Sequence, residues 1–404
     1  MKKHIKLLIV LGIVLLSGIS FFLGKESKEK DIFKEESSNI KKKDTHLNSV
    51  SMMLETKANS GNYEMTTRDS WPTEGYIFNL ELSKCENGGE LSWDNEKKVV
   101  LMSGNVSDKC YVYFDKVLTL ANYVKEQYNG VQGNNNIYYH NGTLENGIND
   151  GSYRYAGASD AVNNYVCISN ENPCSDKDLF RIIGVFDERV KLIKATPSGN
   201  KPWDSNGSNT WSTASLNKYL NGEYLISLGN FANKIDVNSW KVGGNTFDKI
   251  TLNVIPKVAF QNEIISPNPI NSSDNAKEYT AKIGLMYVTD YYYTASSNYW
   301  GLYGLSYDSS KGYASNGYNS AADNNWLFVK NLNQWTITRD GNRDGFGINR
   351  VYNVGDNGIV GDLPPEEISY ASINVIFRPT FYLSNSVSYL SGSGTSSDPI
   401  ILGD

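Results

Sequence analysis

The stretch DLFRIIGVFDERVKLIKATPSGNKPWDSNGSNTWSTASLNKYLNGEYLISL, residues 178–228, carries the strongest fold signal in the chain. Two short apolar runs, Leu179–Val185 and Val190–Ala195, flank the polar tip 187–189. Ile, Val, Leu and Phe dominate both runs, and this composition around a polar turn is typical of a β-hairpin. The segment therefore predicts two adjacent antiparallel strands in the centre of a folded domain.

The second half of this segment predicts an amphipathic helix. Leu216, Tyr219 and Leu220 fall on one helical face, Ser212 can cap the start, and Gly222 suits the left-handed residue after the end. A hairpin, a polar loop and a helix in this order predict a mixed α+β domain.

Further apolar runs extend this domain towards the C-terminus. We predict a helix around Trp240 and a segment of strand or helix at 247–259. Strands are predicted at 281–288, 325–330, 334–339, 347–352 and 373–383.

Several motifs in these segments carry a resemblance to a known family. They are RIIGV at 181–185, VKLI at 190–193, PWD at 202–204, SLNKYLN at 215–221, AKIGLMYVTDY at 281–291, WTITR at 335–339 and FRPTFYL at 377–383. Together they resemble an uncharacterised family of secreted or surface proteins from low-GC Gram-positive bacteria, over roughly Asn135 to Leu402. The resemblance implies a C-type-lectin-like domain, the superfamily that also holds the formylglycine-generating enzymes and the variable receptor-binding proteins of retroelements.

The composition is that of a folded, acidic protein. Its 404 residues are 40% hydrophobic and carry a net charge of −6, with no cluster of cations after Lys43. This charge argues against nucleic acid as a partner, because binding phosphates requires clustered cations. The 27 tyrosines and 35 glycines are typical of a polar, turn-rich extracellular surface.

The four cysteines predict two disulfides. Cys85, Cys110, Cys167 and Cys174 form no CxxC pair and have no neighbouring histidine, so a redox or metal motif is disfavoured. Pairing by proximity joins Cys85 to Cys110 and Cys167 to Cys174, which is one of three possible connectivities.

The N-terminal segment predicts export. Leu7–Gly24 is uncharged, long enough to span a bilayer and preceded by a basic stretch. A cleaved signal peptide and a retained anchor are both compatible with it. The absence of small residues before a cleavage point favours the anchor, which predicts a single-pass membrane protein with an extracellular C-terminal part.

The rest of the chain divides into three predicted regions. Residues 25–70 form a charged stalk or linker, because 25–44 hold seven lysines and six acidic residues. Residues 71–130 form a small β module joined by a linking helix at Val117–Tyr128 to the lectin-like domain, 131–404.

No catalytic motif supports an enzyme. Beyond the leader there are two histidines, His46 and His140, and neither lies near a cluster of metal ligands or a serine nucleophile motif. The formylglycine-generating enzymes use two cysteines late in the lectin-like domain. Here every cysteine precedes Ser175, so these residues cannot be carried over and such an enzyme remains the weakest alternative.

One pattern is compatible with calcium. Asp340, Asn342 and Asp344 in DGNRDG match the first half of a calcium loop, but position 351 holds Val where an EF-hand carries its glutamate. A polar hairpin tip satisfies the same pattern for conformational reasons alone. Apart from this possible calcium, no cofactor is predicted.

The densest aromatic stretch, 287–326, is the predicted ligand-binding region. It holds nine tyrosines and two tryptophans among Gly, Ser and Asn, which is the composition of a binding loop. Tyr287, Trp300 and Trp326 are predicted to belong to the core. The predicted ligand-binding residues are Tyr291, Tyr292, Tyr299, Tyr303, Tyr307 and Arg343.

These observations predict a membrane-tethered extracellular protein that binds a cell-surface glycan or protein through its C-terminal domain. The alternative is a structural protein of the cell envelope in which the same domain serves assembly. Enzymatic activity of the formylglycine-generating type is the third hypothesis.

Overall fold

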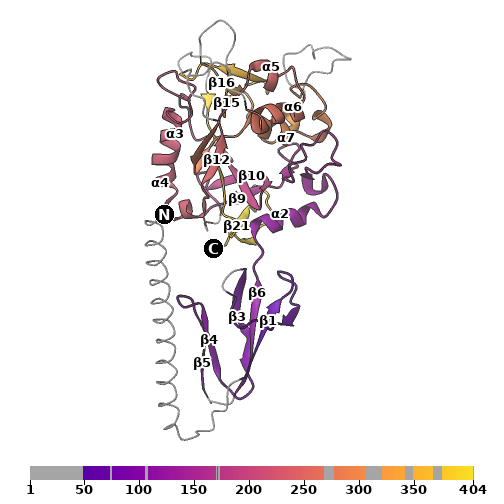
Figure 1. Ribbon diagram of the computed structural model, residues 1–404, viewed down its shortest axis with the longest axis vertical. Coiled ribbons are helices and arrows are strands. Elements are labelled where there is room, and N and C mark those ends of the chain that lie inside the picture. Colours follow the sequence, from indigo (N-terminus) through magenta and orange to yellow (C-terminus); the bar gives the residue numbers. More distant parts are fainter. Residues whose placement is uncertain are drawn as a thin grey trace, which may run out of the picture. The chain divides into compact units, whose positions relative to one another are not determined.

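The structure divides into two compact units, with the boundary between Lys116 and Val117 (Figure 1). It is a computed structural model, and it describes residues 49–72, 75–104, 108–169, 171, 173–267, 277–305, 321–341, 349–366 and 375–403. The predicted membrane segment, 7–24, lies outside the described residues. Among the described residues, no helix is long and apolar enough to cross a membrane.

The N-terminal unit is built from strands throughout its described part. These are β1 (Ser49–Glu55), β2 (Tyr63–Met65), β3 (Tyr76–Cys85), β4 (Glu90–Asp94), β5 (Val99–Ser103) and β6 (Lys109–Lys116). Four of them form a sheet in the order β2-β1-β6-β3, and β4 and β5 form a separate hairpin. Val112 and Phe114 of β6 are completely buried, and the disulfide Cys85–Cys110 joins β3 to β6. The predicted disulfide-linked β module is therefore confirmed.

The boundaries of this module differ from the prediction at both ends. Strands β1 and β2 lie within 25–70, which was predicted as a linker. Strand β1 pairs in parallel with β6, more than fifty residues away, and buries Met52 there. Strand β1 gives no clear local signal in the sequence, because it is short and partly exposed and its partner is distant in the chain.

The predicted linking helix is present but belongs to the C-terminal unit. It is α2 (Leu120–Tyr128), and the Thr119 hydroxyl accepts a hydrogen bond from the Asn122 amide at its start. Asn129 ends the helix in the left-handed conformation. Leu120 and Val124 are buried in the core of the C-terminal unit.

The main sheet of the C-terminal unit is formed around the predicted hairpin. Its strands are β7 (Ile137–Tyr139), β8 (Tyr153–Tyr155), β9 (Tyr165–Cys167), β10 (Leu179–Phe186), β11 (Arg189–Lys194), β14 (Ile283–Gly284), β19 (Thr380–Tyr382), β20 (Tyr389–Ser391) and β21 (Ile400–Leu402). The path β14-β19-β11-β10-β9-β21-β20 runs through it, and β8 pairs with β10 and β7. At the tip of the hairpin, Asp187 and Glu188 both have positive φ, as a tight hairpin turn requires.

The two ends of this unit lie together, as predicted. The last strand, β21, pairs in parallel with β9, and β19 pairs with β11. Near the start of α2, Thr119 forms a bridge with Ser388. The FRPTFYL segment is thus part of the central sheet beside the hairpin, as expected.

Smaller sheets and short helices surround the main sheet. The remaining strands are β12 (Asn238–Lys241), β13 (Glu278–Ala281), β15 (Asn333–Arg339), β16 (Val351–Val354), β17 (Val360–Leu363) and β18 (Val375–Ile376). The helices are α3 (Ser215–Tyr219), α4 (Leu225–Ser227), α5 (Phe247–Ile250), α6 (Pro256–Phe260) and α7 (Val288–Thr294). Short 3₁₀ segments are η1 (Asn134–Asn136), η3 (Gly229–Lys234), η5 (Ser297–Tyr299) and η6 (Ala322–Asn324), and two π-helical turns are η2 (Leu220–Tyr224) and η4 (Gln261–Ile265). The described chain is thus mixed α+β with more strand than helix.

Several local predictions need correction. The helix after the hairpin begins at Ser215 rather than after Ser212, and it continues through Gly222 as the π turn η2. Trp240 lies in a strand, β12, because it pairs with β13 rather than continuing the helical turns before it.

Within the predicted strand 281–288, Ala281 ends β13 and only Ile283 and Gly284 form β14. The segment then turns into helix α7, where Asp290 accepts a hydrogen bond from the Tyr287 amide. Leu216 and Leu220 of the preceding helical segment are buried as predicted.

Candidate functional site

The structure places part of the predicted tyrosine surface in the core. Every residue of α7 is buried, and Tyr291 and Tyr292 are 0% exposed. The Tyr291 hydroxyl donates to the carbonyl of Gly358, and the Tyr292 hydroxyl donates to the carbonyl of Ile250, both at 2.9 Å. Neither ring offers a face to a ligand, so the prediction is corrected for these two residues. The amphipathic character that suits tyrosine to a binding surface equally suits a core in which the hydroxyl finds a backbone acceptor.

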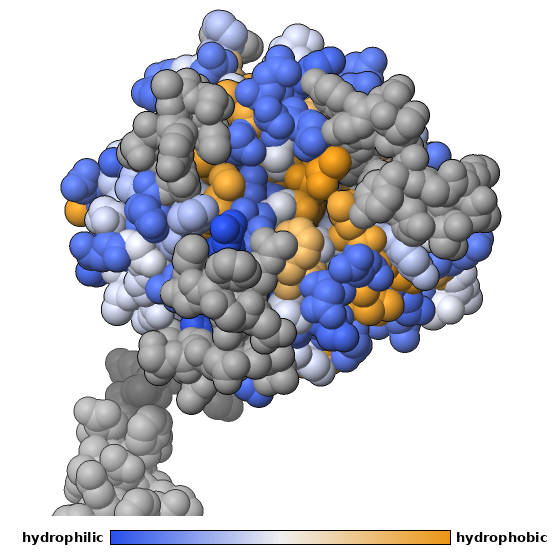
Figure 2. All heavy atoms as spheres, turned by 90° about the horizontal axis from the view of Figure 1, so that it is seen from above, coloured by the Kyte–Doolittle hydropathy of each residue, from blue (hydrophilic) through white to orange (hydrophobic). Residues whose placement is uncertain are grey.

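The other predicted ligand-binding residues are placed differently. Tyr299 is half-buried and Tyr303 is 39% exposed, whereas Tyr307 and Arg343 lie outside the described residues. The end of the unit that carries β15, β16 and α5 is seen from above in Figure 2, where hydrophobic residues gather between hydrophilic ones. The core predictions for Tyr287, Trp300 and Trp326 are confirmed.

The calcium hypothesis stays a prediction. Of its three residues only Asp340 is described; Asn342 and Asp344 are not. Asp340 is buried at the end of β15, where its amide donates to the carbonyl of Arg350. The described carboxylate and cysteine side chains come together in one possible metal group, Cys85, Asp108 and Cys110, and there the cysteines are joined as a disulfide.

Both predicted disulfides are confirmed. The Sγ atoms of Cys85 and Cys110 are 2.00 Å apart, and those of Cys167 and Cys174 are 1.95 Å apart. No described cysteine is free.

A cleft with charged groups in its floor is the strongest candidate site in the described residues. We call it the charged cleft; its volume is about 270 Å³. Its walls come from the loop before β8, the hairpin tip between β10 and β11, strand β12, turn η4, and the residues Tyr287 and Tyr382. Six separate parts of the sequence therefore meet around it.

Alternating charges form the floor of the charged cleft. Lys191 Nζ lies 2.5 Å from Asp290 Oδ2, and Arg154 Nη1 lies 3.8 Å from Asp290 Oδ1. Arg154 Nη2 in turn contacts Asp150 Oδ2 at 2.7 Å. Lys191, Arg154 and Asp290 are each at most 3% exposed. Charges at this depth are tolerated because each has a partner of opposite sign.

Aromatic rings surround the two cations of this floor. Lys191 Nζ lies 4.4 Å from the centre of the Tyr287 ring, and the rings of Trp240, Phe186 and Tyr382 follow within 5.6 Å. The Arg154 guanidinium lies 4.5 Å from the centre of the Phe186 ring. Ring faces carry partial negative charge, so they add attraction for both cations and exclude water from them.

The backbone also holds Asp290 in place. Its Oδ2 accepts the Tyr287 amide at 2.8 Å while it contacts Lys191. Glu263 of η4 accepts the amides of Val288 and Thr289, both at 2.9 Å. The backbone amides at the start of α7 therefore donate to two carboxylates. The partial positive charge at a helix N-terminus stabilises negative charge on such groups. Burial raises the pKa of Glu263, against the lowering effect of these hydrogen bonds.

The rim of the charged cleft holds an arginine with no acidic partner. Arg189 donates to Asn238 Oδ1 at 3.1 Å, and its guanidinium lies 4.9 Å from the centre of the Tyr382 ring. Among the residues that the structure describes, no carboxylate lies within ion-pair distance of it. This guanidinium is held in one orientation and retains donors that a ligand can use.

A π-helical turn forms the apolar wall of the charged cleft. Ile264 and Ile265 of η4 line it, and Ile265 is 57% exposed. π-helical turns are rare and occur frequently at functional sites. The charged cleft thus offers a cationic group beside an apolar wall.

Two ionisable groups near the floor have displaced pKa values. Burial would raise the pKa of Asp150, but the charge of Arg154 and hydrogen bonds from Ser152 and Arg154 outweigh it and lower the pKa. His140 is completely buried against Tyr293 and Trp300 rather than lying in an open loop. Burial, followed by the nearby charge of Arg154, lowers the pKa of His140 well below its usual value.

Sequence reasoning missed this site. Lys191 stands alone in the apolar run VKLI, and Asp290 stands in MYVTDY. A lysine inside a fully buried strand was the available signal, because lysine is rarely buried without a partner. The partner, 99 positions away, could not be named without the fold.

The chain matches no family model, no curated protein sequence and no solved structure.

Proposed function

We propose that this protein is an exported, membrane-tethered binding protein and that its C-terminal unit, of C-type-lectin-like fold, binds a ligand carrying an anionic group. The position of Arg189 is the main support for this proposal. This arginine stands at the rim of the charged cleft, oriented by Asn238 and Tyr382, without a carboxylate partner in the described structure. A planar guanidinium that is already positioned binds a carboxylate in two parallel hydrogen bonds at low entropic cost.

The charge of the charged cleft supports an anionic ligand. Its walls include four cations, Arg154, Arg189, Lys191 and Lys241, and three acids, Asp150, Asp187 and Asp290. The two buried cations are paired within the floor, so Arg189 remains for an incoming anion. Ile265 and the Tyr382 ring would contact an apolar part of the ligand. A cell-surface glycan with an acidic sugar, or an acidic protein segment, has this chemistry.

Export is supported by the apolar segment Leu7–Gly24 and by the two disulfides, which form in oxidising compartments. Protease added to intact protoplasts should digest the ectodomain. A soluble product that starts near Lys25 in the medium would instead identify a cleaved signal peptide.

An array of acidic glycans, acidic peptides and their neutral analogues tests the ligand class. The full chain in detergent should bind at least one acidic probe and bind its neutral analogue about tenfold more weakly, since each 1.4 kcal/mol is tenfold in affinity. Arg189→Gln should remove this preference. Arg68→Gln, the same substitution at an exposed arginine of the N-terminal unit, is the matched control. Equal binding of acidic probes by Arg189→Gln and the unmodified chain would refute the proposal.

A structural role in the envelope is the second candidate, and an apolar surface of the N-terminal unit favours it. Strand β3 is an edge strand, and Ile77 and Leu80 on it are 63% and 59% exposed. An exposed apolar edge is a site for strand addition by another chain. Concentration-dependent sedimentation of the full chain that disappears in Leu80→Lys would support assembly.

A further inference from the structure

We propose that the C-terminal unit contains a second ligand site, the hydroxyl pocket, which binds an uncharged sugar residue. The hydroxyl pocket is a cavity of about 610 Å³. Three segments line it: the loop around the disulfide Cys167–Cys174, the end of β11 through Ser198, and the segment from Tyr224 to Phe231. No residue of the charged cleft is among them, so the two sites are separate.

Two buried hydroxyl groups carry this proposal. Ser198 and Tyr224 line the hydroxyl pocket, but their hydroxyl oxygens are inaccessible to solvent, so a ligand reaches them only when these side chains rotate. Neither has a hydrogen-bond partner among the described residues. A buried hydroxyl without a partner costs about 1–3 kcal/mol, so two in one pocket indicate a polar ligand that completes them.

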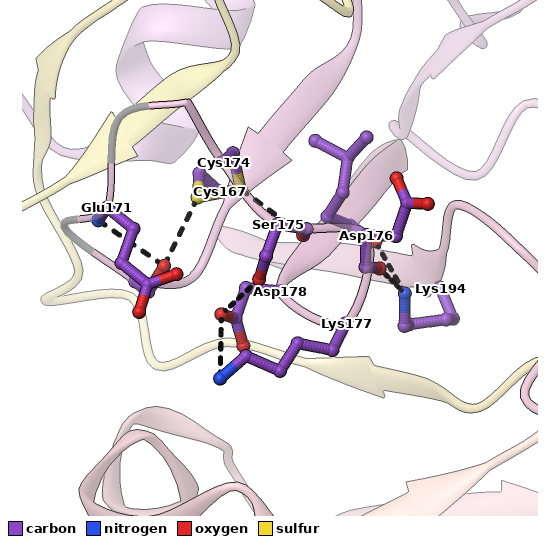
Figure 3. Close-up of a disulfide and its surroundings, with 10 residues drawn as sticks. Cys167, Glu171, Cys174, Ser175, Asp176, Lys177, Asp178 and Lys194 are labelled. Carbon is purple, nitrogen blue, oxygen red and sulfur yellow. Dashed lines mark hydrogen bonds and ion pairs between the residues drawn. A yellow bond between two sulfur atoms is a disulfide. The ribbon is translucent and has the colours of Figure 1, made fainter.

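Three of the four charged side chains of the hydroxyl pocket, those of Lys177, Asp178 and Lys194, already have partners in the protein. Lys194 Nζ donates to the carbonyl of Asp176 (Figure 3) and to that of Leu179. It also donates to Thr196 Oγ1, so all three of its protons are used. Lys177 pairs with Asp178 at 3.7 Å. Two lysines and two aspartates line the hydroxyl pocket, so no net charge selects an ion.

The remaining walls suit the apolar face of a sugar ring. Ile168, Leu228 and Phe231 line the hydroxyl pocket beside the two hydroxyls. A sugar presents hydroxyls around its edge and C–H groups on its faces. The hydroxyls of Ser198 and Tyr224 can both donate and accept, which matches this edge better than a carboxylate or an ammonium group.

Two structural devices hold this arrangement. The π-helical turn η2 ends at Tyr224, and the charged cleft likewise has a π turn, η4, in its wall. The disulfide Cys167–Cys174 lies beside Ile168 and Ser169, which line the pocket, and Ser175 donates to Asp178 just beyond it (Figure 3). A wall fixed before binding reduces the entropic cost of taking a ligand.

Saturation-transfer NMR with the full chain in detergent tests the hydroxyl pocket. The probes are glucose, galactose, N-acetylglucosamine and their β-linked disaccharides. At least one should bind, and Tyr224→Phe and Ser198→Ala should each weaken it by about tenfold or more, the loss of one well-placed hydrogen bond. Tyr219→Phe is the matched control, because this half-buried tyrosine lies one turn away and does not line the hydroxyl pocket.

Three outcomes would overturn the inference: no binding of any sugar, unchanged binding by Tyr224→Phe and Ser198→Ala, or equal loss in Tyr219→Phe. Near-ultraviolet circular dichroism of each variant shows that the fold is kept. Arg189→Gln should leave sugar binding unchanged. The proposal for the hydroxyl pocket can therefore fail independently of the proposal for the charged cleft.

Discussion

The charged cleft and the hydroxyl pocket lie in the same unit, but the protein satisfies their polar groups in opposite ways. In the charged cleft, Asp290 forms ion pairs with Lys191 and Arg154. The hydrogen-bond donors that remain available are those of Arg189 at the rim. In the hydroxyl pocket, the Lys194 ammonium is satisfied by the protein, and the buried hydroxyls of Ser198 and Tyr224 have no described partner. A buried charge without a partner would cost too much free energy, so it must be paired in the free protein. A buried hydroxyl without a partner costs only about 1–3 kcal/mol, so it can remain unpaired until a ligand binds. The first arrangement should therefore stabilise the fold and the second should cost stability.

The largest effect is expected from removing the central acid of the charged cleft. Asp290→Ala leaves Lys191 buried without its partner and removes a hydrogen bond from the start of α7. We expect a loss of about 3–5 kcal/mol in the free energy of unfolding, measured by urea titration. Asp187→Asn, at the exposed hairpin tip, removes an acid and keeps a residue that tolerates positive φ, so it should change stability by about 0.5 kcal/mol at most.

A double variant sharpens this result. Lys191→Met combined with Asp290→Asn removes both charges and keeps a side chain that can accept the Tyr287 amide. It should recover more than half of the lost stability, because a buried ion pair replaced by neutral groups costs little. A double variant as unstable as Asp290→Ala would show that packing rather than charge pairing holds this floor.

Removing the disulfide beside the hydroxyl pocket should have the next largest effect. Cys167 and Cys174 are 7 positions apart, and a loop of this size predicts a loss of about 2 kcal/mol in the chain-entropy model when both become Ser. Sugar binding should weaken as well. Replacing Cys85 and Cys110 in the N-terminal unit controls for disulfide loss as such and should leave sugar binding unchanged.

The pH dependence of stability should reveal His140 beside the charged cleft. Its folded-state pKa is lowered, first by burial and then by the charge of Arg154, so the native state holds the neutral ring. Stability from this group is present above the unfolded pKa of 6.5 and is lost as pH falls below it, because only the unfolded state gains the proton.

His140→Phe should remove this loss. Between pH of about 6.5 and 5.5 the unmodified chain should lose about 1 kcal/mol more than the variant, in urea titrations at each pH. Above about pH 7.5 the two chains should differ by a constant amount, which serves as the control. Parallel curves through the acidic range would mean that His140 is protonated in the native state.

The smallest effect is expected in the hydroxyl pocket. Tyr224→Phe removes a buried hydroxyl that has no described partner, so stability without ligand should be unchanged or rise by up to about 1 kcal/mol. Tyr219→Phe is again the control, in thermal unfolding of both variants. A loss above about 1 kcal/mol in Tyr224→Phe would show that the hydroxyl is satisfied in the free protein, and the contrast between the two sites would fail.

Local patterns in the sequence determined the elements and their nearest partners. The alternation of apolar runs and a polar tip predicted the hairpin 179–194, and the helical spacing of Ala121 and Val124 predicted the helix there. The short separations of the cysteines predicted both disulfides. Each of these features depends on interactions between residues close in the chain, so the residues that make them are visible together.

Only the tertiary structure decided which polar and aromatic residues meet. It buries Tyr291 and Tyr292, which composition alone assigned to a surface. It brings Lys191 to Asp290 across 99 positions, and it sets Ser198 near the turn that carries Tyr224 in one pocket. Burial and pairing of this kind depend on the packing of distant segments, and a tyrosine or lysine has the same local signature whether its surroundings are protein or water.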